Sequence, residues 1–198
     1  MDSKLSKRAL NLAYFTIIYN VLEGILSIFA GLSAGSISLI GFGLDSAVES
    51  LSAAVIAWRF RKQNNISKDE EERIEKNALK YIGYTFFILA IYVLYESIMK
   101  LYNAEISEPS ILGILITGTS LIVMPVLFYY KYQTGKSLKS RSVIADSKET
   151  LACSFLSGTV LVGLLANYFY GFWQADPLIG FLIVIFLLRE GYEIFKDI

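Results

Sequence analysis

The chain has 198 residues, of which 55% are hydrophobic and 18% charged, and its mean hydropathy is +0.52. A soluble domain has about 45–50% apolar and roughly 25% charged residues, so the composition argues against one. The single cysteine excludes an internal disulfide, and the formal net charge of zero says little about partners because the basic residues are clustered.

Apolar runs of about 20 residues recur along the chain, and each is long enough to cross a hydrocarbon core of about 30 Å. They predict an all-α, polytopic membrane protein with six transmembrane helices, organised as a single transmembrane domain over 1–198 with no soluble domain. The N-terminal segment is charged but has no small-residue cleavage site, so we expect the first run to be a retained span and not a signal peptide. The expected spans are about 9–31, 37–58, 79–101, 110–130, 144–169 and 177–195.

Basic residues are distributed unevenly over the connections between these spans. Of the 18 Lys and Arg residues, all but Lys100 fall in the N-terminal segment, in the 59–80 and 131–148 connections or at the C-terminal end. The positive-inside rule therefore predicts that both termini are cytoplasmic. Topology explains the basic clusters, so we expect no nucleic-acid partner. The 59–80 connection is predicted to be either a helical extension of the third span, beginning near Ser67, or a solvated loop.

Two carboxylates, Asp45 and Glu49, lie inside the second span. Their spacing of four residues places them on one helical face, about one turn apart. A charge at membrane depth costs at least roughly 2.5 kcal/mol on insertion scales. No basic residue lies deep in any predicted span to neutralise them, so a bound cation is the simplest explanation for the pair.

The fifth span begins with a similar set, in which Asp146, Glu149 and Cys153 are spaced to share one face. Asp45, Glu49, Glu149 and Cys153 would together offer a small metal ion three oxygens and one sulfur. Zinc accepts this combination, whereas magnesium and calcium prefer shells of oxygen alone. Simpler interpretations stay open: Asp146 as a helix cap, Glu149 in the interfacial zone, and Cys153 as a small buried residue.

Asn20 and Glu23 lie on one face of the first span, three residues apart. Glu23 is a candidate accessory or proton-relay residue. The alternative is a structural hydrogen bond to a serine or tyrosine of a neighbouring span.

Three motifs resemble the cation diffusion facilitator family of divalent-metal antiporters. They are Gly35-Ser36-Ile37-Ser38-Leu39 before the acidic pair, Ala145-Asp146-x-x-Glu149-x-x-x-Cys153, and Ala175-Asp176-Pro177-Leu178. The second span is most similar to the short, transmembrane protein 163-like branch, and the chain ends at Ile198, where the family usually continues into a cytoplasmic domain. The family's metal site matches Asp45 and Glu49 in the second span and Glu149 and Cys153 in the fifth. The Glu149–Cys153 pair departs from the family's usual His or Asp followed by Asp.

The resemblance implies a secondary active transporter that exports a divalent transition metal from the cytoplasm in exchange for protons. The cargo would be Zn²⁺ first, with Cd²⁺, Co²⁺, Fe²⁺ and Mn²⁺ open, and no cofactor is expected. The resemblance also implies a homodimer in the lipid membrane, held through the third and second spans or through the 59–80 segment. The competing functions are a metal-cation channel and a non-transporting metal sensor or partner protein. An enzyme is not expected, because no nucleophile and base are paired and the chain has no histidine.

Overall fold

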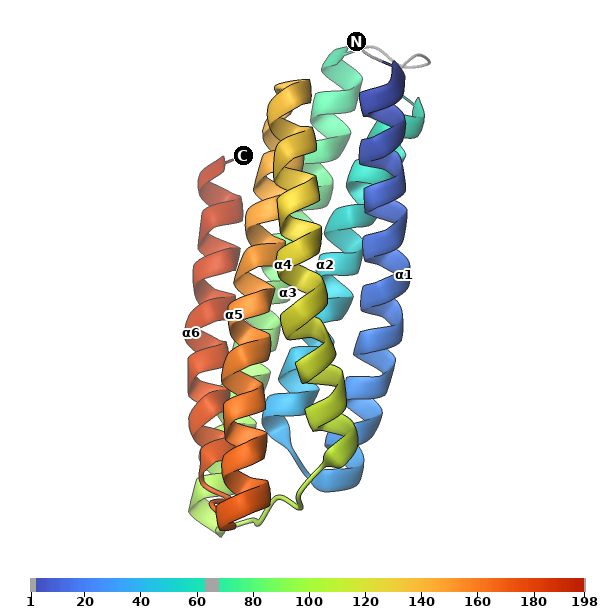
Figure 1. The fold of residues 1–198 in the computed structure, drawn as a ribbon. Coiled ribbons are helices and arrows are strands. Elements are labelled where there is room, and N and C mark those ends of the chain that lie inside the picture. The colour runs from blue at the N-terminus through green and yellow to red at the C-terminus, as the bar shows by residue number, and fades with distance from the viewer. Residues whose placement is uncertain (1–2, 63–67, 198) are drawn as a thin grey trace.

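The computed structural model describes residues 3–62 and 68–197, and all their regular secondary structure is helical. Six helices run lengthwise beside one another in a single bundle, and the two ends of the chain lie at the same end of it (Figure 1). Each predicted span falls on a separate helix, which confirms the all-α fold. The helices are α1 (Ser3–Ala34), α2 (Ile37–Lys62), α3 (Lys68–Asn103), α4 (Ile111–Leu138), α5 (Arg141–Tyr170) and α6 (Ala175–Asp197).

Among the described residues, five helices are long and apolar enough to cross a membrane. The segments that qualify are Lys4–Ala34, Ile37–Arg61, Gly83–Asn103, Ile111–Leu138 and Ser142–Tyr170. The sixth helix has a shorter apolar run, which ends at Arg189 and Glu190. It nevertheless belongs to the bundle, because Ile183 and Leu187 are fully buried in the core that it shares with α3.

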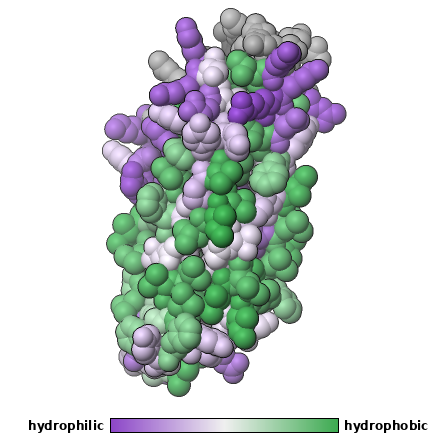
Figure 2. Space-filling model, viewed as in Figure 1, coloured by the Kyte–Doolittle hydropathy of each residue, from purple (hydrophilic) through white to green (hydrophobic). Residues whose placement is uncertain are grey.

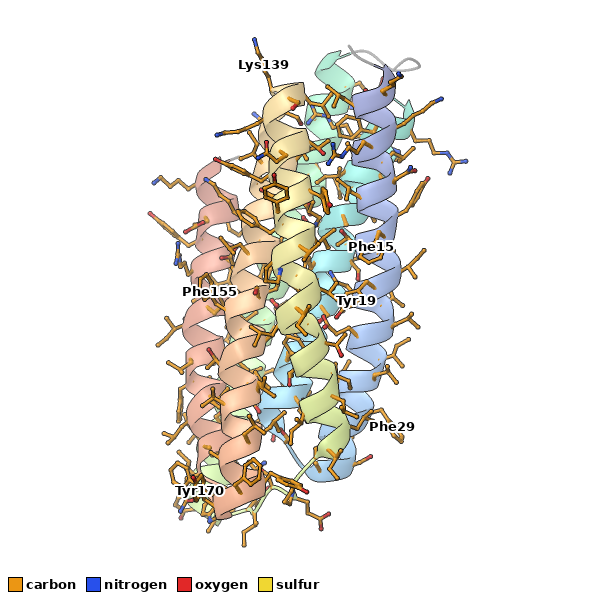
Figure 3. All side chains as sticks on the ribbon, viewed as in Figure 1. Phe15, Tyr19, Phe29, Lys139, Phe155 and Tyr170 are labelled. Atoms are coloured by element: carbon orange, nitrogen blue, oxygen red, sulfur yellow. The ribbon has the colours of Figure 1, made fainter. Side chains whose placement is uncertain are left out.

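The outer surface of the bundle is apolar and the interior contains many polar side chains. Large hydrophobic residues of α1 point outward, among them Ile18 and Phe29, both 63% exposed. On the face that Figure 2 shows, hydrophobic residues cover the middle of the bundle, and most hydrophilic residues gather at the end that carries the termini. Lys139 lies at that end and Tyr170 at the opposite one (Figure 3). This arrangement suits a protein whose outer surface faces lipid.

Glycines allow α1 and α2 to pack closely. A Cβ atom added at Gly24 would lie 2.9 Å from the carbonyl oxygen of Gly43, and one added at Gly43 would lie 2.8 Å from the Ile28 side chain. Gly35 closes the turn between the two helices with a φ of +60°, a conformation that glycine adopts without strain. The close pair fixes α1 against the helix that carries Asp45 and Glu49.

Two helices, α3 and α4, extend furthest beyond the predicted spans. α3 begins at Lys68, which confirms the helical extension, while the expected start near Ser67 lies outside the described residues. α4 continues to Leu138, past the predicted end at 130. The second difference matters for the site, because it places Lys131 inside a helix and not in a connection.

Candidate metal centre

The acidic pair of α2 faces α5 inside the bundle. Asp45 is 2% exposed and Glu49 is 1% exposed. The Cys153 thiol donates a hydrogen bond to Asp45 Oδ2 over 3.0 Å. One turn away, the Thr150 hydroxyl donates to Glu49 Oε1 over 2.6 Å. One predicted residue of each helix, Asp45 of α2 and Cys153 of α5, is therefore in contact.

Three carboxylates in this region each keep one buried oxygen without a hydrogen-bond partner. The atoms are Glu49 Oε2, Asp146 Oδ1 and Glu149 Oε1. A buried acceptor left unsatisfied costs about 1–3 kcal/mol, and more when the group is charged. Several such oxygens from two helices are what a site for a small cation requires, so the donor chemistry fits a metal ion. The buried oxygen of Glu149 also argues against a purely interfacial position for that side chain.

Lys131 of α4 is the residue that sequence reasoning missed. It is 1% exposed, and its Nζ lies 2.8 Å from Asp146 Oδ2 and 3.7 Å from Glu49 Oε1. The ammonium also donates to the Thr150 hydroxyl over 2.8 Å. The expectation that no basic residue lies deep enough to neutralise the acidic pair is therefore wrong. The missed pattern was the helical periodicity of α4, whose buried face runs through Ser120, Met124, Leu127, Lys131 and Thr134.

Asp146 does not cap α5. The helix begins at Arg141 after the N-cap residue Ser140, so Asp146 lies in its second turn. Its side chain is buried against Lys131. The cap interpretation is therefore wrong, because the helix starts earlier than the predicted span did.

The four predicted ligands, Asp45, Glu49, Glu149 and Cys153, do not form one closed shell in this conformation. Within residues 3–62 and 68–197, no group of three or more Asp, Glu or Cys side chains is arranged so that it would enclose a metal ion. The structure brings Asp45 together with Cys153, and Glu49 together with Thr150 and Lys131. The four-ligand set stays a prediction.

A family model described as the cation efflux transmembrane domain matches residues 13–198. The chain belongs to the cation efflux family. The resemblance drawn from the motifs is thereby confirmed. Because members of this family are transporters, the expectation that the chain is not an enzyme is confirmed as well.

Several curated proteins are similar to this cation efflux domain over most of its length. Transmembrane protein 163 of Xenopus laevis is 24% identical over 96% of the chain and 67% of its own length. The magnetosome protein MamB of Paramagnetospirillum magneticum is 26% identical over 83% of the chain and 56% of its own length. A cadmium, cobalt and zinc/H(+)-K(+) antiporter of Bacillus subtilis is 26% identical over 97% and 62%. The chain thus spans between 56% and 67% of the length of these relatives.

On the α1 side of this cation efflux domain, Glu23 and Asn20 are buried next to α2. The Ser46 hydroxyl donates a hydrogen bond to Glu23 Oε2 over 2.9 Å. This is the structural hydrogen bond to a serine of a neighbouring span that was the alternative prediction for Glu23. Glu23 Oε1 and both polar atoms of the Asn20 side chain have no partner among the described residues. Tyr19 is hydrogen-bonded to Ser120 of α4 over 2.8 Å, in the space between α1 and α4 (Figure 3). A polar layer therefore extends from Glu23 to Ser46, the residue next to Asp45.

The far end of the bundle is closed around Asp176, the second residue of α6. Its carboxylate accepts hydrogen bonds from the backbone N–H groups of Ile37 and Ser38, over 2.9 and 3.2 Å. It also binds Lys100, the one basic residue assigned to that side, over 2.8 Å. Asp176 thus caps α2 from the start of another helix.

Proposed function

We propose that this cation efflux domain exports a divalent transition-metal cation, Zn²⁺ first, from the cytoplasm in exchange for protons. The observation that carries the proposal is the buried acidic pair of α2, which contacts the thiol of Cys153 on α5, together with unsatisfied carboxylate oxygens on both helices. The name of the Bacillus subtilis relative, which includes cadmium, cobalt, zinc and protons, supports this choice. Fe²⁺ and Mn²⁺ remain further cargo candidates.

The proposed ligands are Asp45, Glu49, Glu149 and Cys153. Metal ligands must be deprotonated, so binding at this site has to displace the thiol proton that Cys153 now shares with Asp45. A thiol and three carboxylates can each take up a proton when the metal leaves. Proton exchange therefore requires no histidine, in agreement with the composition. Glu23 is proposed as an accessory residue of proton transfer, because its hydrogen bond with Ser46 joins it to α2. Asn20, one turn before Glu23 on α1 and also buried, is proposed as a second accessory residue.

Alternating access around this site needs two ends that open in turn. We assign the end with the termini to the cytoplasm, because the hydrophilic and basic residues gather there. The contacts of Asp176 with α2 and α3 close the opposite end in this conformation. The same proposal includes a homodimer, formed through α3 and α2 or through the 59–80 connection.

The decisive experiment measures metal flux and proton flux in liposomes that contain only the purified chain. Asp45→Asn and Glu49→Gln preserve shape while removing charge, and each is expected to abolish Zn²⁺ flux. Glu96→Gln is the matched control, because Glu96 is an acid of another helix and is only half-buried. A metal panel of Zn²⁺, Cd²⁺, Co²⁺, Fe²⁺ and Mn²⁺ then identifies the cargo.

The outcomes separate the competing functions. Flux that needs a proton gradient and disappears in Asp45→Asn supports the antiporter. Flux that is indifferent to the gradient indicates a channel. Tight binding without flux from the purified wild type indicates a metal sensor or partner protein.

A further inference from the structure

Lys131 carries a buried positive charge between α2, α4 and α5. Its ammonium is buried and contacts one carboxylate from each of the two helices that carry the proposed ligands. The other buried lysine among the described residues, Lys100, lies at the opposite end of the bundle with Asp176. The proposed site therefore contains one cation that belongs to the protein itself.

The two carboxylates hold this ammonium unequally. Asp146 Oδ2 lies at 2.8 Å, whereas Glu49 Oε1 lies at 3.7 Å and accepts its hydrogen bond from Thr150. Glu49 belongs to the proposed ligand set and Asp146 does not. A divalent ion on Glu49 would repel an ammonium this close, and charges repel more strongly in a buried region than in water. Asp146 offers Lys131 a position that it can keep while the metal is bound.

We propose that Lys131 competes with the transported cation for Glu49. The ammonium offsets one of the two negative charges of Glu49 and Asp146 when no divalent ion is bound, and it pairs with Asp146 alone when a divalent ion takes Glu49. This inference rests on the proposed function, because it concerns the same site. This competition keeps the affinity of the site for the divalent ion low enough for the ion to leave. Transport requires release of the ion as well as its binding. Asp146 acts as a positioning residue, since it holds the lysine and does not contact the cargo.

The test is equilibrium Zn²⁺ binding to the full chain in lipid nanodiscs, measured by calorimetry at one fixed pH. Lys131→Met keeps an unbranched side chain and removes the charge. It is expected to bind Zn²⁺ about tenfold more tightly, which corresponds to about 1.4 kcal/mol. In liposomes its Zn²⁺ turnover should fall, because release becomes slower. Lys136→Met is the matched control: it makes the same change in the same helix at an exposed lysine, and it should bind as the wild type does.

A second pair of variants tests the competition even if Lys131→Met folds poorly. Asp146→Asn leaves Lys131 with Glu49 as its nearest charged partner, so Zn²⁺ binding should weaken by about tenfold. In the double variant Lys131→Met/Asp146→Asn that weakening should disappear. Weakening that persists in the double variant would identify Asp146 as a metal ligand and overturn the inference.

Unchanged or weaker Zn²⁺ binding in Lys131→Met overturns this inference alone. A lysine that only orients Thr150 and Glu49 would give that result. Absence of Zn²⁺ binding by the wild-type chain overturns the proposed function, and this inference with it. Tighter binding in Lys131→Met, together with the loss of the Asp146→Asn effect in the double variant, supports both.

Discussion

Lys100 of α3 and Asp176 of α6 form a buried ion pair, with 2.8 Å between Nζ and Oδ2, at the end of the bundle opposite the termini. The same carboxylate accepts the backbone N–H groups of Ile37 and Ser38 at the start of α2. The Lys100 ammonium also donates to the carbonyl of Gly35 in the turn before α2. One acidic side chain therefore fixes the ends of three helices, including the helix that carries Asp45 and Glu49.

Asp176→Asn is expected to destabilise the protein strongly. The substitution leaves the buried Lys100 ammonium without its counter-ion, and breaking a buried pair in this way costs about 3–5 kcal/mol. Chemical unfolding in mixed micelles, followed by circular dichroism, measures the change in the free energy of unfolding. Glu193→Gln is the control: it removes the exposed pair with Arg189 and should leave that free energy unchanged. An equal loss in both variants would contradict the assigned role.

Gly24→Ala is expected to push α1 away from α2. Its new methyl group would lie 2.9 Å from the Gly43 carbonyl oxygen, which is backbone and cannot rotate aside. Overpacking of this kind costs about 1–3 kcal/mol. Gly118→Ala is the matched control, since nothing lies within 4 Å of a Cβ atom there and alanine favours a helix over glycine. The same unfolding measurement should show opposite signs for the two variants.

Cys153→Ser is expected to change the metal preference of the site more than its stability. Serine keeps the size and a hydrogen bond to Asp45 but replaces a soft sulfur ligand by oxygen, which favours Mn²⁺ relative to Zn²⁺ and Cd²⁺. The ratio of Zn²⁺ to Mn²⁺ affinities should fall by about tenfold, or about 1.4 kcal/mol. Competition binding with both metals measures this ratio. If the ratio does not move, Cys153 is a packing residue and not a ligand.

Glu23→Gln separates proton transfer from hydrogen bonding on the α1 side. Glutamine can still accept the hydrogen bond from Ser46 but cannot ionise. We expect Zn²⁺ affinity within about threefold of the wild type and a marked loss of proton-coupled flux at fixed pH. Ser46→Ala serves as the comparison, because it removes the hydrogen bond and leaves the carboxyl group. Normal flux in Glu23→Gln would restrict Glu23 to a structural role.

Much of the fold and the acidic pair of the candidate site could be predicted from the sequence, because the relevant physics is local. The apolar runs fix which segments form membrane-spanning helices, since insertion depends on length and composition along one segment. The four-residue spacing places Asp45 and Glu49 on one face whatever their neighbours are. The same periodicity predicted that Asp146, Glu149 and Cys153 share one face of α5. The structure places Cys153 of that face, and its neighbour Thr150, against the α2 pair.

Only the tertiary structure decided which charges meet. From the sequence alone, a lysine near a predicted helix end, such as Lys131, can be either solvated or buried. Its long aliphatic side chain allows the ammonium group to lie in either environment. Its burial depends on Asp146 and Glu49, which belong to two other helices. The cap that Asp176 of α6 provides for α2 also depends on tertiary packing, because Asp176 and Ile37 are 139 positions apart in the sequence. Side-chain periodicity assigns a residue to a helix face, whereas the partner across that face is set by the packing of distant helices.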